Sequence, residues 1–325
     1  TAVPTTLVPT AAPSITTSLS LNITIFNTST LNIDGCLNSS SPSTCNLRSA
    51  WAACNNLADN LECIINLPSP AGEIEIDTDA YTFVVTSNAR VHIQGNGNRL
   101  KVAASGSIPS LFQYVAASDN EERPSLELHN LILEGFGDPL SFDEAQPTKG
   151  GAIHIEGNCN LLVDSVSFVS TGAIYGGAVY VDNTAGSIVI QKSTFSDTLG
   201  ADRGGAIYLT DTSNVQILEN HFINSRTIYD TDGFGGAICA YSGNSNLYME
   251  GNTFERCRAE SGGAVYLRED NADITIANSN FTSCESAAAG GAVTLYRLND
   301  DISITSSSFT NCEAGASGGA IFLFG

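Results

Sequence analysis

Apolar and polar residues alternate with a period of two along the second half of the chain, and the alternation is tied to a repeat. The triplet Gly-Gly-Ala recurs at intervals of 26 to 31 residues. Its seven starts are Gly150, Gly176, Gly204, Gly235, Gly262, Gly290 and Gly318. A repeat of this length predicts a stacked solenoid, in which each unit buries its apolar face only against its neighbours.

Each repeat contains two short strands followed by a phenylalanine, as in the unit from Gly262 to Cys284. Period-two alternation marks strands that bury one face, so equivalent residues are expected to stack into internal columns. The first strand supplies Ile153, Val179, Ile207, Ile238, Val265, Val293 and Ile321. The second strand supplies Val163, Ile190, Ile217, Met249, Ile276 and Ile304. The third column is Phe168, Phe195, Phe222, Phe254, Phe281 and Phe309.

The corners of the repeat carry small residues. The paired glycines fit a tight corner in which φ is positive and a side chain would meet the next coil. Three residues after each phenylalanine stands a small polar residue or a cysteine: Thr171, Thr198, Ser225, Cys257, Cys284 and Cys312. For the three cysteines we favour buried free thiols, and a bridge between adjacent coils is the alternative.

The Gly-Gly-Ala-Ile/Val and Phe-x-x-small motifs resemble the repeats of the polymorphic outer membrane protein family, with Thr, Ser or Cys where that family has Asn. Upstream, residues 45–54 (CNLRSAWAAC) and 64–68 (IINLP) are similar to the N-terminal element of β-helix proteins of the CSLREA type. The resemblance covers residues 45–325. It implies an all-β, right-handed, single-stranded parallel β-helix on a cell surface, with a short amphipathic α-helix covering the first coil.

We therefore expect three parts. Residues 1–32 form a Thr/Pro-rich arm with one strand, residues 33–72 a disulfide-stapled helical cap, and residues 73–325 the parallel β-helix, regular from residue 150. The strand of the arm, residues 19–26, is interpreted as the start of the first coil. The alternative is that it adds to a neighbouring subunit.

Composition indicates an extracellular or cell-surface protein. The 325 residues carry a formal net charge of −21, which disfavours nucleic acid and anionic membranes as partners. No apolar run reaches the roughly 18–20 residues that span a membrane. The sequence begins at Thr1 with neither an initiator Met nor a signal peptide, as expected for a processed, secreted chain.

Cysteines and sequons agree with that location. Cys36, Cys45, Cys54 and Cys63 are each nine residues apart and predict two disulfides, with three connectivities open. A zinc site is the alternative, although the spacing lacks C-x-x-C pairs. Sequons predict covalent glycans at Asn22, Asn27, Asn38 and Asn280.

Two features suggest a binding surface. One outward position per coil carries His154, Tyr180, Tyr208, Cys239, Tyr266, Thr294 and Phe322. Of these, Tyr180, Tyr208, Tyr266 and Phe322 are candidate contacts for a carbohydrate or a surface partner, and aromatic pairing that stabilises the sheet is the favoured alternative. Two insertions, residues 135–149 and 226–234, break the repeat. In the second, Asp230 and Asp232 are calcium candidates, unless they are merely solvated; no other metal or cofactor is expected.

The pattern favours a protein that is not an enzyme. The acidic residues Glu156, Asp182, Asp211, Asp270 and Asp300 recur once per coil, as turn residues do, and the four histidines are scattered. The first hypothesis is a secreted structural protein, a rigid glycosylated rod that assembles head to tail with its own copies into a fibril, because the last coil ends without a cap. An adhesin segment that binds carbohydrate or a surface receptor is the second, and a polysaccharide lyase or hydrolase the third.

Overall fold

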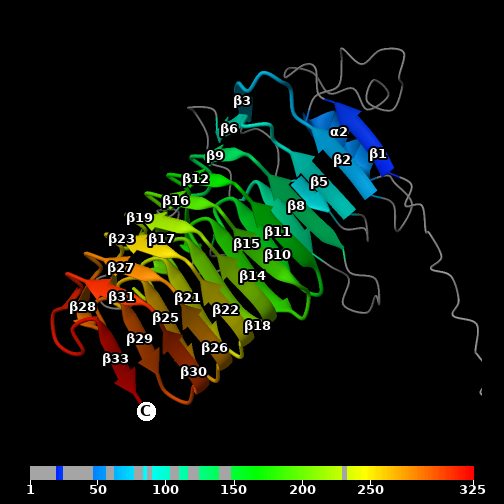
Figure 1. The fold of residues 1–325 in the computed structure, drawn as a ribbon. Helices are drawn as coiled ribbons and strands as arrows, with labels where there is room; N and C mark the ends of the chain where they lie inside the picture. Colours follow the sequence, from blue (N-terminus) through cyan, green and yellow to red (C-terminus); the bar gives the residue numbers. More distant parts are fainter. Residues whose placement is uncertain are drawn as a thin grey trace, which may run out of the picture.

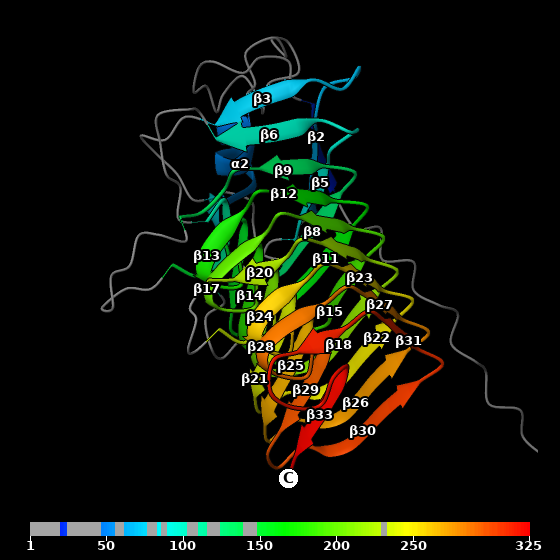
Figure 2. The same ribbon diagram turned by 90° about the vertical axis from the view of Figure 1, so that its left-hand side faces the viewer.

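The computed structural model describes residues 20–24, 47–55, 62–76, 83–85, 90–102, 110–115, 124–138, 148–228 and 233–325. In this part the chain winds into a column of coils whose strands all pair in parallel with the equivalent strands one coil away (Figure 1). Figure 2 shows the same coils from the side, with the C-terminal strand β33 at one end of the column. The predicted parallel β-solenoid is confirmed.

The strands form four faces, named A to D here. Face A contains β1 (Ser20–Thr24), β2 (Glu62–Asn66), β5 (Arg90–Gln94), β8 (Ser125–His129), β11 (Asn160–Asp164), β15 (Ile188–Gln191), the second half of β18 (Ile207–Leu218), β22 (Ser245–Glu250), β26 (Ala272–Ala277) and β30 (Asp300–Thr305). Face B contains β3 (Glu73–Ile76), β6 (Arg99–Val102), β9 (Ile132–Glu134), β12 (Ser167–Val169), β16 (Thr194–Ser196), β19 (His221–Ile223), β23 (Thr253–Glu255), β27 (Asn280–Thr282) and β31 (Ser308–Thr310).

Face C contains β4 (Phe83–Val85), β7 (Phe112–Val115), β10 (Ile153–Glu156), β14 (Val179–Thr184), the first half of β18, β21 (Ile238–Ser242), β25 (Val265–Glu269), β29 (Val293–Tyr296) and β33 (Ile321–Phe324). Face D contains β13 (Gly172–Tyr175), β17 (Leu199–Arg203), β20 (Arg226–Thr227), β24 (Arg258–Ser261), β28 (Glu285–Ala289) and β32 (Glu313–Ala314). Strand β18 continues from face C into face A and pairs with β21 and β22 in turn.

The three predicted internal columns fill the interior. Phe168 to Phe309 stack face to face along face B, with ring centroids 4.6–4.8 Å apart, which is the spacing of paired strands. The residues of the two aliphatic columns are fully buried from Ile153 to Val293 and from Val163 to Ile276. In the last described coil Ile304 and Phe309 are half-buried and Ile321 is exposed, because β30, β31 and β33 each pair with a strand on one side only.

Buried asparagines, which the repeat pattern did not single out, line two corners. Between faces C and A, Asn244 donates through Nδ2 to Oδ1 of Asn271 at 2.8 Å, and Asn271 donates likewise to Asn299. Between faces A and B, Asn220 donates to Oδ1 of Asn252. Each amide satisfies backbone groups of a neighbouring coil as well, so these ladders hold the corners without leaving unpaired polar groups.

The corner cysteines are thiols. Cys257, Cys284 and Cys312 are free, as the favoured interpretation predicted; the first two are buried and Cys312 is half-buried. The thiol of Cys257 donates to the carbonyl oxygen of Phe222 at 3.8 Å, and that of Cys284 to the carbonyl oxygen of Phe254 at 3.7 Å. They occupy the place that Thr198 and Ser225 take in earlier coils, where the two hydroxyls are hydrogen-bonded.

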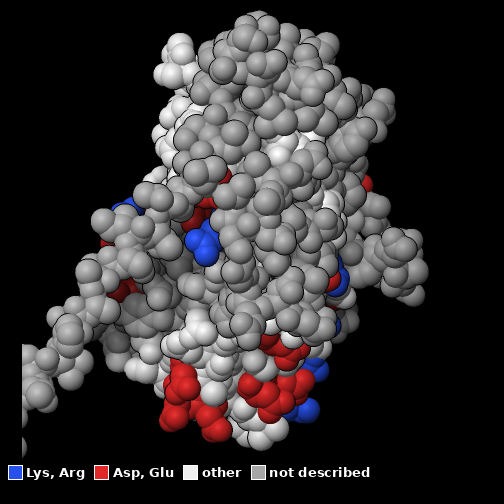
Figure 3. Space-filling model, turned by 90° about the vertical axis from the view of Figure 1, so that its right-hand side faces the viewer, with Lys and Arg blue, Asp and Glu red and all other residues white. Residues whose placement is uncertain are grey.

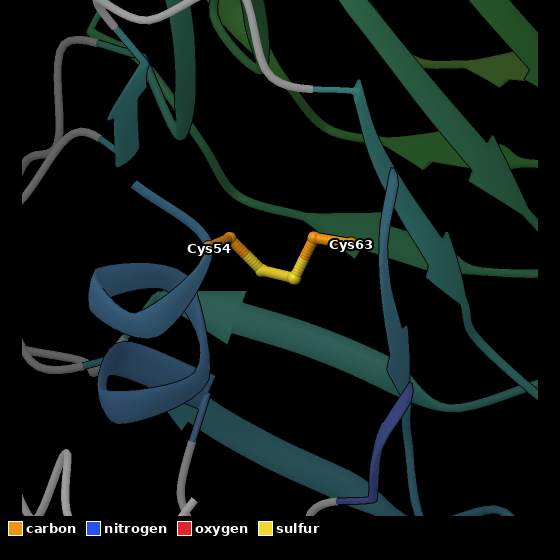
Figure 4. Close-up of a disulfide and its surroundings, with 2 residues drawn as sticks. All are labelled: Cys54 and Cys63. Atoms are coloured by element: carbon orange, nitrogen blue, oxygen red, sulfur yellow. A yellow bond between two sulfur atoms is a disulfide. The ribbon is translucent and has the colours of Figure 1, made fainter. Parts of the chain in front are cut away.

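A helix covers the first coils, α2 (Leu47–Asn55). Its Trp51 is 4 % exposed, packs against Phe83 and Phe112, and donates through Nε1 to the carbonyl oxygen of Val84. A disulfide joins Cys54 of the helix to Cys63 of β2 (Figure 4). Cys36 and Cys45, the other two cysteines of the predicted pair of bridges, lie outside the described residues.

Strand β1 pairs in parallel with β2 of the same chain, from Ser20 opposite Glu62 to Thr24 opposite Asn66. The strand predicted in the arm therefore extends face A within this molecule, which agrees with the interpretation that it belongs to the first coil. Beyond this strand, residues 1–19 and 25–46 lie outside the described residues.

Candidate ligand-binding cleft

The outer side of face C carries two parallel columns of side chains, because residues two apart in a strand point the same way and equivalent strands are in register. A third column, at the end of the face D strands, runs beside them. The central column runs through His154, Tyr180, Tyr208, Cys239, Tyr266, Thr294 and Phe322. The column two residues later includes Tyr241, Arg268, Tyr296 and Phe324. The column before the glycine pair is Lys149, Tyr175, Arg203, Phe234, Ser261, Ala289 and Ser317.

The predicted aromatic ladder of the central column faces away from the core, but it is not open to solvent. Tyr180, Tyr208 and Tyr266 are only 3–5 % exposed, and Phe322 is half-buried. The reason is that side chains of the two flanking columns pack against them and form a second apolar cluster, outside the interior of the coils. Tyr180 and Tyr208 stack on each other with centroids 5.3 Å apart, as the alternative interpretation, aromatic pairing within the sheet, predicted.

A cleft opens where small residues interrupt these columns. Ser261 and Ala289 follow Arg203 and Phe234 in one column, and Thr294 follows Tyr266 in the central one. The space they leave has a volume of about 350 Å³. Its lining is Arg203, Phe234, Tyr241, Ser261, Tyr266, Arg268, Ala289, Thr294, Tyr296 and Phe322. Large aromatic side chains with a few polar groups between them are typical of ligand-binding sites.

Two arginines line the cleft beside the ring of Tyr241. The guanidinium carbons of Arg203 and Arg268 lie 4.1 and 4.2 Å from the ring centroid of Tyr241, within range of a cation–π interaction. Nε of Arg203 lies 3.5 Å from Oδ2 of Asp202, and Nη2 of Arg268 lies 3.5 Å from Oε1 of Glu269. The side chain of Arg268 is 30 % exposed, so it is partly accessible from solvent.

The chain as a whole is acidic. The chain has only 13 Lys and Arg against 34 Asp and Glu, and Figure 3 shows acidic side chains gathered over the C-terminal coils on one side of the molecule. Asp211, Asp270 and Asp300, which the sequence placed in turns, are all exposed, and the first two adopt positive φ. Against this acidic background, two arginines lie together in the lining of the cleft.

The other predicted site residues lie elsewhere. Asn280 is exposed at the start of β27 on face B, with Phe281 buried beside it, and Asn22 lies in β1. Asn27, Asn38 and the calcium candidates Asp230 and Asp232 are outside the described residues. The sequence did not identify Tyr241, Tyr296, Arg203 or Arg268. Tyr241, Arg268 and Tyr296 each stand two residues after a member of the central column, and Arg203 stands a few residues before one. These spacings are the signal that would have found them.

A basic residue and a histidine surround Glu156, the last residue of β10 on the same face. The Nζ of Lys149 donates to Oε1 of Glu156 at 2.8 Å, and Nε2 of His154 lies 2.9 Å from the same oxygen. Desolvation by burial lowers the pKa of His154 despite the adjacent carboxylate. Burial raises the pKa of Glu156, but the hydrogen bonds from Lys149 and His154 outweigh it and the net pKa is lowered.

These pKa directions predict a pH-dependent stability. Because the pKa of His154 is lower in the folded state, the unfolded chain binds more protons than the folded chain once the pH falls below about 6.5. The free energy of unfolding therefore decreases as the pH falls below that value. The contribution of Glu156 is lost only below its ordinary range near pH 4.5. We expect the urea midpoint to fall between pH 7 and pH 5.5, and to fall less in His154→Asn; an equal fall in the variant would contradict the assignment.

The parallel faces, the stacked internal columns and the glycine corners define the class of this molecule as a parallel β-helix. A family model described as right handed beta helix region matches residues 151–324, more than half of the chain. The chain therefore belongs to the right-handed β-helix family. The comparison with curated proteins finds no match. The two finer resemblances, to polymorphic outer membrane protein repeats and to a CSLREA-type cap, stay interpretations of the sequence.

Helix α2 has nine residues. Among the described residues, no helix combines the length and the apolar character needed to cross a bilayer.

Proposed function

We propose that this protein is an extracellular binding protein, in which a rigid β-helix presents the cleft on face C to an acidic oligosaccharide. The observation that carries the proposal is the composition of the cleft: the half-buried rings of Tyr241 and Tyr296 lie in its lining together with the partly exposed side chain of Arg268. This is the second of the hypotheses drawn from the sequence, with the site moved from the central column to the cleft beside it.

The chemistry of the lining selects the ligand class. Aromatic faces pack against the apolar C–H faces of sugar rings while the hydroxyls stay hydrated. Arginine binds carboxylate and sulfate through paired, charge-assisted hydrogen bonds. Aromatic residues of the lining lie on β21, β25, β29 and β33, which follow one another along the column, so an elongated ligand can contact several coils in succession.

The extracellular part of the proposal rests on the cap and on the charge. A disulfide between the cap helix and the first coils suits an oxidising compartment, and the strong net negative charge suits a soluble surface. Covalent glycans at the four sequons, a fibril of head-to-tail copies and a polysaccharide-degrading activity stay predictions or hypotheses of the sequence.

The test is the binding of oligosaccharides to matched variants. The full chain would be titrated with uronic-acid, sulfated and neutral oligosaccharides of equal length. We expect Arg268→Gln to weaken binding of the acidic sugars by about tenfold or more, because a hydrogen bond to a charged group contributes about 1.5–3 kcal/mol. Arg256→Gln is the control, since Arg256 is 53 % exposed beside Glu255 on face B, away from the cleft.

A second pair of variants tests the aromatic contribution. Tyr241→Ala removes the ring next to both arginines, whereas Tyr248→Ala removes an exposed ring on face A that lines no part of the cleft. Loss of binding in Tyr241→Ala alone, with both variants folded, supports the proposal. Equal binding by all four variants, or binding of no sugar in the panel by the wild type, would overturn it.

A further inference from the structure

Two histidines and a glutamate meet on the outer side of face A, far from the cleft. They come from β5 and β8, which lie side by side near the N-terminal end of the column (Figure 1). His92 of β5 is opposite Glu127 of β8, and Gln94 is opposite His129. On the other side of β8, Asp164 of β11 is opposite His129. The strand register therefore gathers His92, Glu127 and His129 around one point.

The ligand atoms are spaced as for a metal ion. Nδ1 of His92 is 3.7 Å and Nε2 of His129 is 3.6 Å from the same oxygen, Oε2 of Glu127. All three ligand atoms lie within 4.8 Å of one another. A tetrahedral zinc ion with ligand bonds of about 2.0–2.1 Å separates its ligand atoms by about 3.3–3.4 Å. Small rotations of the side chains would close the remaining gap.

Outer contacts hold both imidazoles with one nitrogen turned toward this point. Nε2 of His92 is hydrogen-bonded with Oε1 of Gln94 at 3.3 Å, and Nδ1 of His129 lies 3.5 Å from Oδ2 of Asp164. A ring nitrogen that donates to such a group leaves the lone pair of the other nitrogen free for a metal. These contacts select Nδ1 of His92 and Nε2 of His129, the two atoms nearest to Glu127.

One polar atom is left without a partner by the protein. The Nε2 atom of His129 has almost no solvent-accessible surface, and it has no hydrogen-bond partner among the described residues. A buried polar group normally finds a partner in the protein or in a bound species. The three side chains keep 19–37 % of their exposure, so an ion can reach the site from solvent.

We propose that His92, Glu127 and His129 form a Zn²⁺ site on face A, with Gln94 and Asp164 orienting the two imidazoles. Two His and one carboxylate are a common zinc ligand set, and the fourth coordination position is left to water or an exogenous ligand. Because β5 and β8 belong to neighbouring coils, the ion ties the two coils together. This site is independent of the cleft and of the function proposed for it.

The probe is Zn²⁺ alone, titrated calorimetrically into the metal-free full-length protein at pH 7.5. We expect one equivalent to bind through these residues and the affinity to fall at least tenfold in His129→Ala and in Glu127→Gln. His221→Ala is the matched control, since His221 lies 3.5 Å from Glu255 on face B without a second histidine. The far-ultraviolet circular dichroism of each variant checks that it is folded.

A second readout distinguishes metal bound at this site from metal bound by the free cysteines or by residues outside those that the structure describes. Co²⁺ bound through nitrogen and oxygen ligands gives visible bands without the thiolate charge-transfer band that a cysteine site produces. Loss of the visible bands in His92→Ala, together with weaker zinc binding in His129→Ala, supports the site. Absence of binding by the wild type, unchanged binding in both histidine variants, or a thiolate band overturns it.

Discussion

Replacing Phe254 by alanine is expected to lower the free energy of unfolding by about 3–5 kcal/mol. Phe254 is fully buried and stacks between Phe222 and Phe281, with centroids 4.8 and 4.6 Å away. The loss has two parts, since removing the ring forfeits its burial and also opens a cavity between two rings that the rigid coils cannot close. Guanidinium unfolding followed by circular dichroism measures the change.

Phe309→Ala provides the graded control in the same column. Phe309 stacks on Phe281 alone and is only half-buried, so its removal should cost roughly half as much. An equal loss for the two variants, or a loss below about 1 kcal/mol for Phe254→Ala, would show that the column does not hold the helix together as its geometry implies.

Gly263→Ala is expected to be at least as damaging, with a loss of about 3 kcal/mol or more. A Cβ at this position would lie 2.1 Å from the backbone oxygen of Gly291 and 2.5 Å from that of Glu285. Both atoms belong to the backbone of the next coil, which cannot move aside without breaking the pairing of strands on both faces. Overpacking against flexible side chains costs about 1–3 kcal/mol, and rigid backbone sets the higher expectation here.

The control for this variant is Gly72→Ala. A Cβ on Gly72 would meet only Oδ1 of Asn98, at 3.9 Å, which is an ordinary contact. Its stability should change by less than about 1 kcal/mol. A thermal midpoint for Gly263→Ala as high as that of Gly72→Ala would contradict the close approach of the coils at the glycine corners.

The regular half of the fold could be predicted because the repeat fixes which residues stack. Once Phe254 is aligned with Phe222 and Phe281, strand direction and the inward face follow from the period of two. The same alignment explains the glycine pair: Gly262 has a φ of +64° and Gly263 touches the next coil. The buried ladders of Asn220, Asn252 and their neighbours share this alignment but were not recognised, since asparagine in a turn has a simpler explanation.

The outer surface of face C was harder to predict. Alternation shows that Tyr208 and Tyr266 point outward, yet it does not show what lies over them. Tyr241 and Tyr296 belong to the neighbouring outward position, and their rings pack against the central column. They do so because paired strands of successive coils are only about 4.7–4.9 Å apart, so large side chains must lean sideways. The cleft depends on three small residues, Ser261, Ala289 and Thr294, whose importance is visible only when the columns are laid side by side.

The cluster of His92, Glu127 and His129 could not be predicted from the sequence. These residues stand before residue 150, where no glycine triplet fixes the phase of one coil against the next. The sequence separations of 35 and 37 residues gave no reason to pair them, and the histidines looked scattered. The register of β5 with β8 supplies the missing information.

The most direct test of the cleft is a crystal structure of the full chain with a bound uronic-acid oligosaccharide. We expect sugar rings packed against Tyr241 and Tyr296, with a carboxylate held by the guanidinium of Arg268. An oligosaccharide bound on another face, with the cleft on face C empty, would contradict it.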